Sequence, residues 1–415
     1  MRLARFGFLR SFLPSGVGVF GLACWLRLPA CFLTVAGCSE PMVRPTQTTQ
    51  QLIAQRDQDD RERKRATDEA IRKNLERIKA RSDAFAAGRG PAPVMEILVI
   101  SGGGDWGAFG AGYLKGWGNV KGELARPKEF DAVTGVSTGA LIAPFAFLGD
   151  DASIEKVVNL YRNPKHDWVK PRGLVEFLNG GQSYAEIPGL ERELDETITL
   201  DTLRRIADAG AQGRVLVVNT TEVDMEAMHV WDVATEARRD VESGKPGRVR
   251  SILLASSAVP GAFPPRIIDG GLYVDGGVSG NIIYGGRAGE DDGFIAQWIA
   301  KYPGTPIPKV RYWVIFNNEF RWPPTTVQPR WGQLLAKTST TATRSATVNA
   351  MRLLLAQAEI ARLKHQASIE VRVVAVPDGW VPPVTGVFTK EGMNALADMG
   401  ERMGADPASW LTEVP

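Results

Sequence analysis

The stretch FDAVTGVSTGALIAPF, residues 130–145, constrains the fold of this chain most strongly. A short apolar run ends at Gly135 and Val136, Ser137 follows, and the apolar residues resume with helical spacing after Gly139. Glycine is needed on both sides of such a turn when the strand and the helix pass too close for a Cβ atom. A tight turn without chemistry would give the same pattern, but its place between a strand and a helix favours a nucleophile at Ser137.

Other runs rich in β-branched residues alternate with helical patterns along the chain. The predicted strands are 96–101, 130–136, 214–223, 310–318 and 371–377, and the predicted helices are 138–148, 249–260 and 331–366. Alternating strands and helices predict the α/β class, as a three-layer α/β/α sandwich with a mostly parallel central sheet. Sites in such sheets form beyond the carboxyl ends of the strands, where the glycine-rich stretches fall.

A second glycine-rich turn, GGGDWG at 102–107, follows the first predicted strand. One reading is a dinucleotide site, which needs an acidic residue at the end of the next strand. Glu123 and Glu129 lie in a turn-like stretch instead, and Asp131 begins a strand. A second reading is an oxyanion hole, in which successive glycine N–H groups converge on developing negative charge. A glycine turn needed only for packing is the third.

A third candidate is Asp275, followed by Gly276 and Gly277. The two glycines leave this carboxylate accessible, although an aspartate before glycines also occurs in ordinary turns. A histidine for a Ser–Asp/Glu–His triad would have to follow Asp275 in sequence, and only His365 does so. Because His365 lies in a polar helical pattern, we expect it at the surface.

Composition excludes several classes of function. The chain has 415 residues, with 49 basic against 47 acidic side chains, so nucleic acid is not expected as a partner. The only cysteines are Cys24, Cys31 and Cys38, which leaves no internal disulfide framework and no Cys/His cluster with zinc-ligand spacing. We therefore expect neither a metal nor a cofactor.

The N-terminal segment 1–38 is typical of a signal sequence, with arginines followed by an apolar stretch. It ends in VAGC, which resembles a bacterial lipoprotein signal with lipidation at Cys38, and Ser39 after it favours the outer membrane. An uncleaved membrane anchor is the alternative, and either would tie the chain to the cell envelope. Residues 39–93 are rich in mixed charges and are predicted to form a helical or disordered tether.

Four blocks together resemble the patatin-like phospholipase family: SGGGDWGAFGAGYLKG, GVSTGALIA, SILLASSAVPGAFPP and VDGG. The resemblance implies a three-layer α/β fold, acyl-ester lipids such as phospholipids as substrate, and a Ser–Asp dyad without histidine. Carried over, Ser137 is the nucleophile, Asp275 the base, and Gly102, Gly103 and Gly104 the oxyanion hole, while the block around Pro260 supports the site. The family usually has Arg or Lys where this chain has Trp106.

This resemblance predicts a catalytic domain at 94–290 and a C-terminal α/β extension at 291–415 packed on it. Two alternatives from other classes stay open: a non-catalytic envelope lipoprotein that uses the fold as a binding module, and a dinucleotide-binding oxidoreductase. Several apolar residues between Ser137 and Asp275 are candidates for an acyl-chain channel, although core positions are the default; they are Trp168, Phe177, Leu178 and Tyr184.

Overall fold

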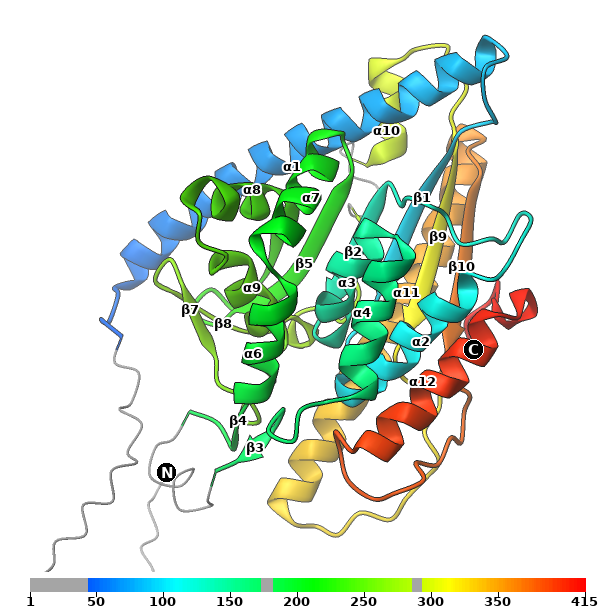
Figure 1. Ribbon diagram of the computed structural model, residues 1–415. Helices are drawn as coiled ribbons and strands as arrows, with labels where there is room; N and C mark the ends of the chain where they lie inside the picture. The colour runs from blue at the N-terminus through cyan, green and yellow to red at the C-terminus, as the bar shows by residue number, and fades with distance from the viewer. Residues whose placement is uncertain (1–43, 173–181, 286–292) are drawn as a thin grey trace, which may run out of the picture. The chain divides into compact units, whose positions relative to one another are not determined.

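The computed structural model describes residues 44–172, 182–285 and 293–415 (Figure 1). The predicted signal segment with Cys38 lies outside these residues, as do Phe177 and Leu178. Within the described ranges, no helix combines the length and the apolar character needed to cross a bilayer.

The centre of the fold is one mixed sheet with the strand order β10-β9-β1-β2-β5-β8-β7, in which β6 also pairs with β5. Every neighbouring pair from β10 to β5 is parallel; these strands are β1 (Val94–Ile100), β2 (Ala132–Val136), β5 (Val215–Glu222), β9 (Lys309–Phe316) and β10 (Ile369–Ala375). The pairs at the other edge are antiparallel; they involve β6 (Ala227–Asp232), β7 (Arg266–Ile268) and β8 (Gly271–Asp275). The predicted mostly parallel α/β sheet is confirmed, whereas the antiparallel edge was not predicted.

Helices cover both faces of the sheet, as the alternating side chains of β1 require. Ile97 and Val99 belong to one hydrophobic cluster, and Leu98 and Ile100 to another. The first cluster is covered by α1 (Thr49–Ala86), α10 (Phe294–Lys301) and α11 (Trp331–His365). The second is covered by α2 (Gly107–Trp117), α3 (Thr138–Leu148), α4 (Asp151–Arg162), α6 (Pro188–Thr197), α7 (Leu200–Ala211), α8 (Val233–Ser243), α9 (Arg248–Ser256) and α12 (Lys390–Gly404). Two short strands, β3 (Lys170–Pro171) and β4 (Ala185–Glu186), pair separately.

The charged segment before the first strand forms the long helix α1, and the later part of this helix packs on the body. Leu75 and Ile78 are buried against the sheet. Arg77 and Arg81 donate hydrogen bonds to the buried carboxylate of Asp131 at 3.1 and 2.9 Å. The helix is therefore held by packing and ion pairs, and a tether role for residues 39–93 stays a prediction.

The C-terminal region shares the same sheet, because it supplies β9 and β10. Its last helix, α12, lies very close to α2: a Cβ atom on Gly112 would be 2.1 Å from the carbonyl oxygen of Ala397, and one on Gly400 would be 2.1 Å from that of Phe109. Only glycine permits this approach between the two helix backbones. The C-terminal region thus completes the sheet beside β1.

Candidate active site

Ser137 lies at a strained turn between β2 and α3, at the carboxyl end of the parallel sheet. Its backbone angles are φ 53° and ψ −124°, a conformation that L-residues rarely adopt. The flanking positions have no room for a side chain: a Cβ atom on Gly135 would lie 2.4 Å from the Gly139 oxygen, and one on Gly139 would lie 2.3 Å from the Ile100 oxygen. The turn therefore has the geometry of a nucleophile elbow.

Two serines at the end of α9 hold this strained turn in place. The Ser137 N–H donates to Oγ of Ser256 at 2.9 Å, and that hydroxyl donates in turn to the Asn219 carbonyl at 2.6 Å. Oγ of Ser257 donates to the Ser137 carbonyl at 3.2 Å. The ASSAVP segment thus positions the turn through hydrogen bonds to its backbone.

Asp275 ends β8 beside this turn and is almost completely buried, with 5% of its surface exposed. Its Oδ1 accepts the Gly277 N–H at 2.7 Å, while Oδ2 has no hydrogen-bond partner among the described residues. Burial raises the pKa of Asp275 to about 6, although the nearby Ser137 side chain and the Gly277 N–H favour the charged form. The carboxylate therefore has an unused oxygen close to Ser137.

The glycine loop after β1 contacts Ser137 from the other side. A Cβ atom on Gly102 would lie 2.9 Å from Cβ of Ser137, and one on Gly103 would lie 2.1 Å from the Asn317 oxygen. The Gly102 N–H donates to Oδ1 of Asn281 at 3.0 Å, so it is already engaged. No acceptor for the N–H of Gly103 or Gly104 is found in the described part of the chain. Of the three predicted oxyanion donors, these two are therefore the available ones.

Two asparagines that we did not predict hold this loop. Asn281 also donates from Nδ2 to Oγ1 of Thr347 on α11, at 3.1 Å. Asn317, which follows β9, donates from Nδ2 to the Ser101 carbonyl at 2.9 Å and accepts the Gly110 N–H at 3.0 Å. Both asparagines are buried. They fix the glycine loop relative to the sheet and to α11.

Comparison with known proteins relates the segment that carries Ser137 and Asp275 to a known family. A family model described as Patatin-like phospholipase matches residues 98–285, the segment that carries all four sequence blocks. Residues 98–285 are thus similar to the patatin-like phospholipase family. Among solved structures, one match is VipD from Legionella pneumophila, with 12% sequence identity and a TM-score of 0.33. The match covers 75% of this chain and 67% of the VipD chain. Among curated proteins, the comparison found no match.

The patatin-like family implies hydrolysis of lipid acyl esters, and one position of this domain departs from its usual pattern. Trp106, where a basic residue is usual, packs in an aromatic group next to the glycine loop. Its ring stacks on Trp322 with centroids 5.9 Å apart and meets Trp380 edge-on at 5.1 Å. Both partners come from the C-terminal region, which therefore reaches the site.

None of the three histidines forms a hydrogen bond with Ser137 or Asp275 in the described residues. His229 lies on β6 with its ring between Trp231 and Tyr273, and burial lowers its pKa to about 4. His365 is exposed in the last turn of α11, as its polar surroundings predict. His166 lies in the turn after α4.

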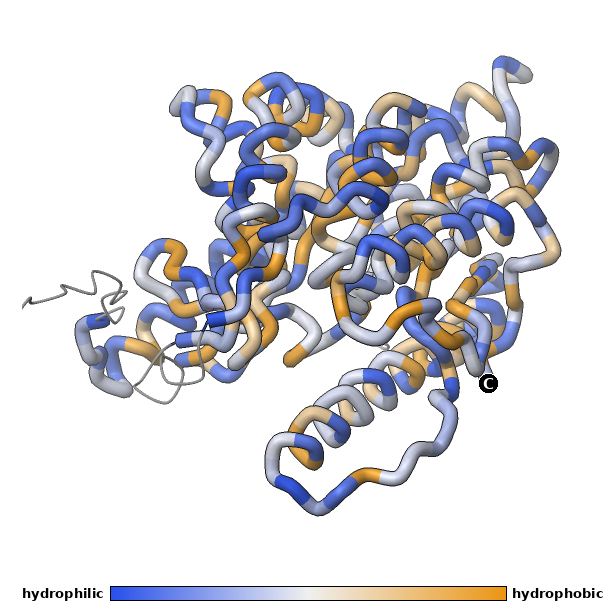
Figure 2. The backbone as a smooth tube through the Cα atoms, turned by 60° about the horizontal axis from the view of Figure 1, so that its bottom comes forward, coloured by the Kyte–Doolittle hydropathy of each residue, from blue (hydrophilic) through white to orange (hydrophobic). Residues whose placement is uncertain are grey.

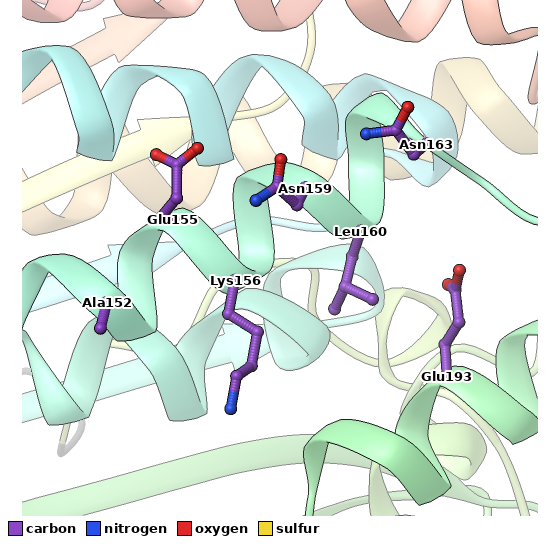
Figure 3. A pocket seen from close by; sticks show the side chains of 7 residues that line it. All are labelled: Ala152, Glu155, Lys156, Asn159, Leu160, Asn163 and Glu193. Atoms are coloured by element: carbon purple, nitrogen blue, oxygen red, sulfur yellow. The ribbon is translucent and has the colours of Figure 1, made fainter.

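The pocket seen in Figure 3 is lined by residues of α4 and by Glu193 of α6. Trp168 is buried and contacts the rings of Tyr161 and Phe388, whereas Tyr184 is half exposed. Glu193 borders the pocket and accepts a hydrogen bond from Trp168 Nε1, and its burial raises its pKa to about 7. None of the predicted site residues lines this pocket. Among the described residues, no cluster of His, Cys, Asp and Glu is arranged to hold a metal.

Proposed function

We propose that this protein is a serine acyl hydrolase that cleaves fatty-acyl esters of membrane lipids through a Ser–Asp dyad. One observation carries the proposal: the buried carboxylate of Asp275 lies next to the side chain of Ser137, which sits on a strained elbow, and no histidine is hydrogen-bonded to either residue. Among the described residues, Ser137 and Asp275 have no hydrogen bond to His166, His229 or His365. Asp275 is left as the base.

The reaction has two steps. As the Ser137 oxygen attacks the acyl carbonyl, its proton passes to Oδ2 of Asp275, and the N–H groups of Gly103 and Gly104 bind the oxyanion. The ester C–O bond then breaks, and the alcohol leaves with the proton. In the second step, Asp275 takes a proton from water as the water oxygen attacks the acyl-serine. The acyl–Oγ bond then breaks, Asp275 returns the proton to Oγ of Ser137, and the fatty acid leaves.

The raised pKa of Asp275 suits this role. A carboxylate with an ordinary pKa is a weak base towards a hydroxyl group. Burial raises the pKa of Asp275 to about 6, so the group is still ionised at neutral pH but binds a proton more readily. Because Ser137 and Asp275 are both buried, electrostatic effects between the reacting groups are stronger there than in water.

We further propose that the chain is held at a bacterial envelope membrane through Cys38, as its lipoprotein-type segment predicts. The anchor would raise the local concentration of a lipid substrate. Two alternatives stay distinguishable. A binding module would retain the elbow geometry without turnover, and a dinucleotide-binding oxidoreductase would carry a cofactor absorbance. The close packing of Gly102 on Ser137 favours the hydrolase over the dinucleotide site.

The test compares hydrolysis of a lipid ester by the wild type and by three variants. Ser137→Ala should abolish turnover, and Asp275→Asn should lower kcat/KM by about 10²–10⁴-fold. His365→Ala should retain the wild-type rate within about twofold, because an exposed residue far along α11 takes no part. Turnover that survives in Ser137→Ala, or that disappears in His365→Ala, would contradict the dyad.

A further inference from the structure

Two segments of the C-terminal region are basic although the whole chain is nearly neutral. No acidic residue occurs from 320 to 358, a range with five basic residues: Arg321, Arg330, Lys337, Arg344 and Arg352. The range 379–390 likewise holds Lys390 and no acidic residue. Among the described residues, Arg321, Arg330, Lys337 and Lys390 form no ion pair with a carboxylate. These charges are therefore available to an external anion.

The same two segments expose large apolar side chains. Trp331, Leu334 and Leu335 occupy one side of the first turns of α11, and Trp331 and Leu335 are 76% and 59% exposed. In the loop before α12, Val381 and Val387 are 77% and 73% exposed. The start of α11 and the loop leading into it project from the body in Figure 2. Exposed apolar residues that gather with basic ones are typical of a surface that binds a partner.

Contacts join the two segments at the glycine loop of the candidate site. Trp322 of the first and Trp380 of the second both pack on Trp106, and the Arg321 N–H donates to Asp378 at 2.9 Å. The Phe388 N–H donates to Oδ2 of Asp105 at 2.9 Å. A Cβ atom on Gly104 would lie 3.8 Å from the Phe388 ring. The basic, apolar surface therefore adjoins the loop that we assign to the oxyanion.

We propose that this surface, residues 320–344 and 379–390, docks on an anionic phospholipid bilayer and brings the site to the membrane. Trp331 and the leucines would enter the boundary between headgroups and acyl chains, where tryptophan is favoured. The unpaired cations would lie against lipid phosphates, each strengthening binding by about fivefold. Docking does not depend on chemistry at Ser137, so it goes beyond the proposed hydrolysis.

A second copy of the chain fits this surface less well. In a two-fold symmetric pair, the same patch lies on both sides of the contact. Arg330, Lys337 and Lys390 would then face the same cations of the partner, and no acidic residue of either segment would offset them. The charge of the patch thus favours an anionic bilayer over self-association.

The test measures binding of the full chain carrying Ser137→Ala to sedimenting vesicles, so that no lipid is hydrolysed. Vesicles of phosphatidylcholine with phosphatidylglycerol are compared with vesicles of phosphatidylcholine alone. Leu335→Glu is the test variant, and Leu363→Glu is the matched control, since Leu363 is 67% exposed on the same helix but outside the patch. Any contribution of residues 1–43 is common to all these proteins.

We expect stronger binding to the anionic vesicles, a loss of about tenfold or more in Leu335→Glu, and no loss in Leu363→Glu. Arg330→Gln with Lys390→Gln should weaken anionic binding by about fivefold per charge. Equal binding of the two glutamate variants would overturn the proposal, and so would equal binding of the parent protein to vesicles with and without phosphatidylglycerol. So would a change of Leu335→Glu from dimer to monomer with vesicle binding intact. Because all arms lack Ser137, these outcomes are independent of whether the protein hydrolyses esters.

Discussion

Asp275→Asn should make the folded chain more stable at alkaline pH while it removes the proposed base. Burial raises the pKa of Asp275 from an ordinary value of 3.8 to about 6. The folded state therefore binds the proton more tightly than the unfolded state does. Stability from this group is fully present below about pH 4, and it is lost as pH rises to about 6. At about 1.4 kcal/mol per pKa unit, the loss is about 3 kcal/mol above that range.

Asparagine is neutral at every pH, and its carbonyl oxygen can still accept the Gly277 N–H. The free energy of unfolding of Asp275→Asn, minus that of the wild type, should thus increase by about 3 kcal/mol between pH about 4 and pH about 8. Urea unfolding at both pH values, followed by tryptophan fluorescence, measures this difference. A difference that does not change with pH would refute the reasoning, because Asp275 would then have an ordinary pKa in the folded state.

Asp131→Asn is the matched control, since Asp131 is also buried but is paired with Arg77 and Arg81. Removing its charge leaves Arg81 without its carboxylate partner, while Arg77 keeps only Glu129. We expect this variant to be destabilised at pH about 8 by about 1–3 kcal/mol. Both substitutions replace an aspartate by an asparagine. If they change the free energy of unfolding at pH about 8 in opposite directions, the environment of each carboxylate must decide the outcome.

Three further predictions concern activity on a soluble ester. For the wild type, kcat/KM should rise with pH through about 6 and then level off, because Asp275 must be ionised to act as base; a rate that falls over this range would contradict that role. Gly103→Ala places a Cβ atom 2.1 Å from the backbone oxygen of Asn317 and should lower kcat about 10²–10³-fold. In the control Gly90→Ala, no atom lies within 4 Å of the new Cβ atom, so kcat should change less than about twofold; equal effects of the two variants would argue against the oxyanion loop. Asn281→Ala removes the acceptor of the Gly102 N–H and should lower kcat about tenfold or more. Thr347→Val removes only one hydrogen bond of Asn281 and should lower kcat less; the reverse order in the same assay would count against positioning by Asn281.

Local patterns in the sequence were sufficient for the parallel part of the sheet and for the turn at Ser137. The strand before Gly135 and the helix after Ser137 are encoded by neighbouring residues, and the structure has α3 at the predicted bounds. The antiparallel edge was missed because β7 and β8 are short and their pairing with β5 depends on long-range contacts. The place of Asp275 at the end of β8 was not predicted for the same reason, although its role as base was.

Asn281 and Asn317 could not be assigned because their role depends on which loops fold next to the glycines. A signal for Asn317 was nonetheless present, since it lies near the carboxyl end of the predicted strand 310–318, where sites form in parallel sheets. The buried side of α1 was also missed. Leu75 and Ile78 are isolated apolar residues in a charged segment, too few to mark an amphipathic helix.

The most direct test of the Ser–Asp dyad is labelling with a fluorophosphonate probe, followed by mapping of the modified peptide. We predict that the wild type and His365→Ala are labelled at Ser137, that Ser137→Ala is not labelled, and that Asp275→Asn is labelled far more slowly. No labelling of the folded wild type in the presence of lipid, or a label on a residue other than Ser137, would contradict the account.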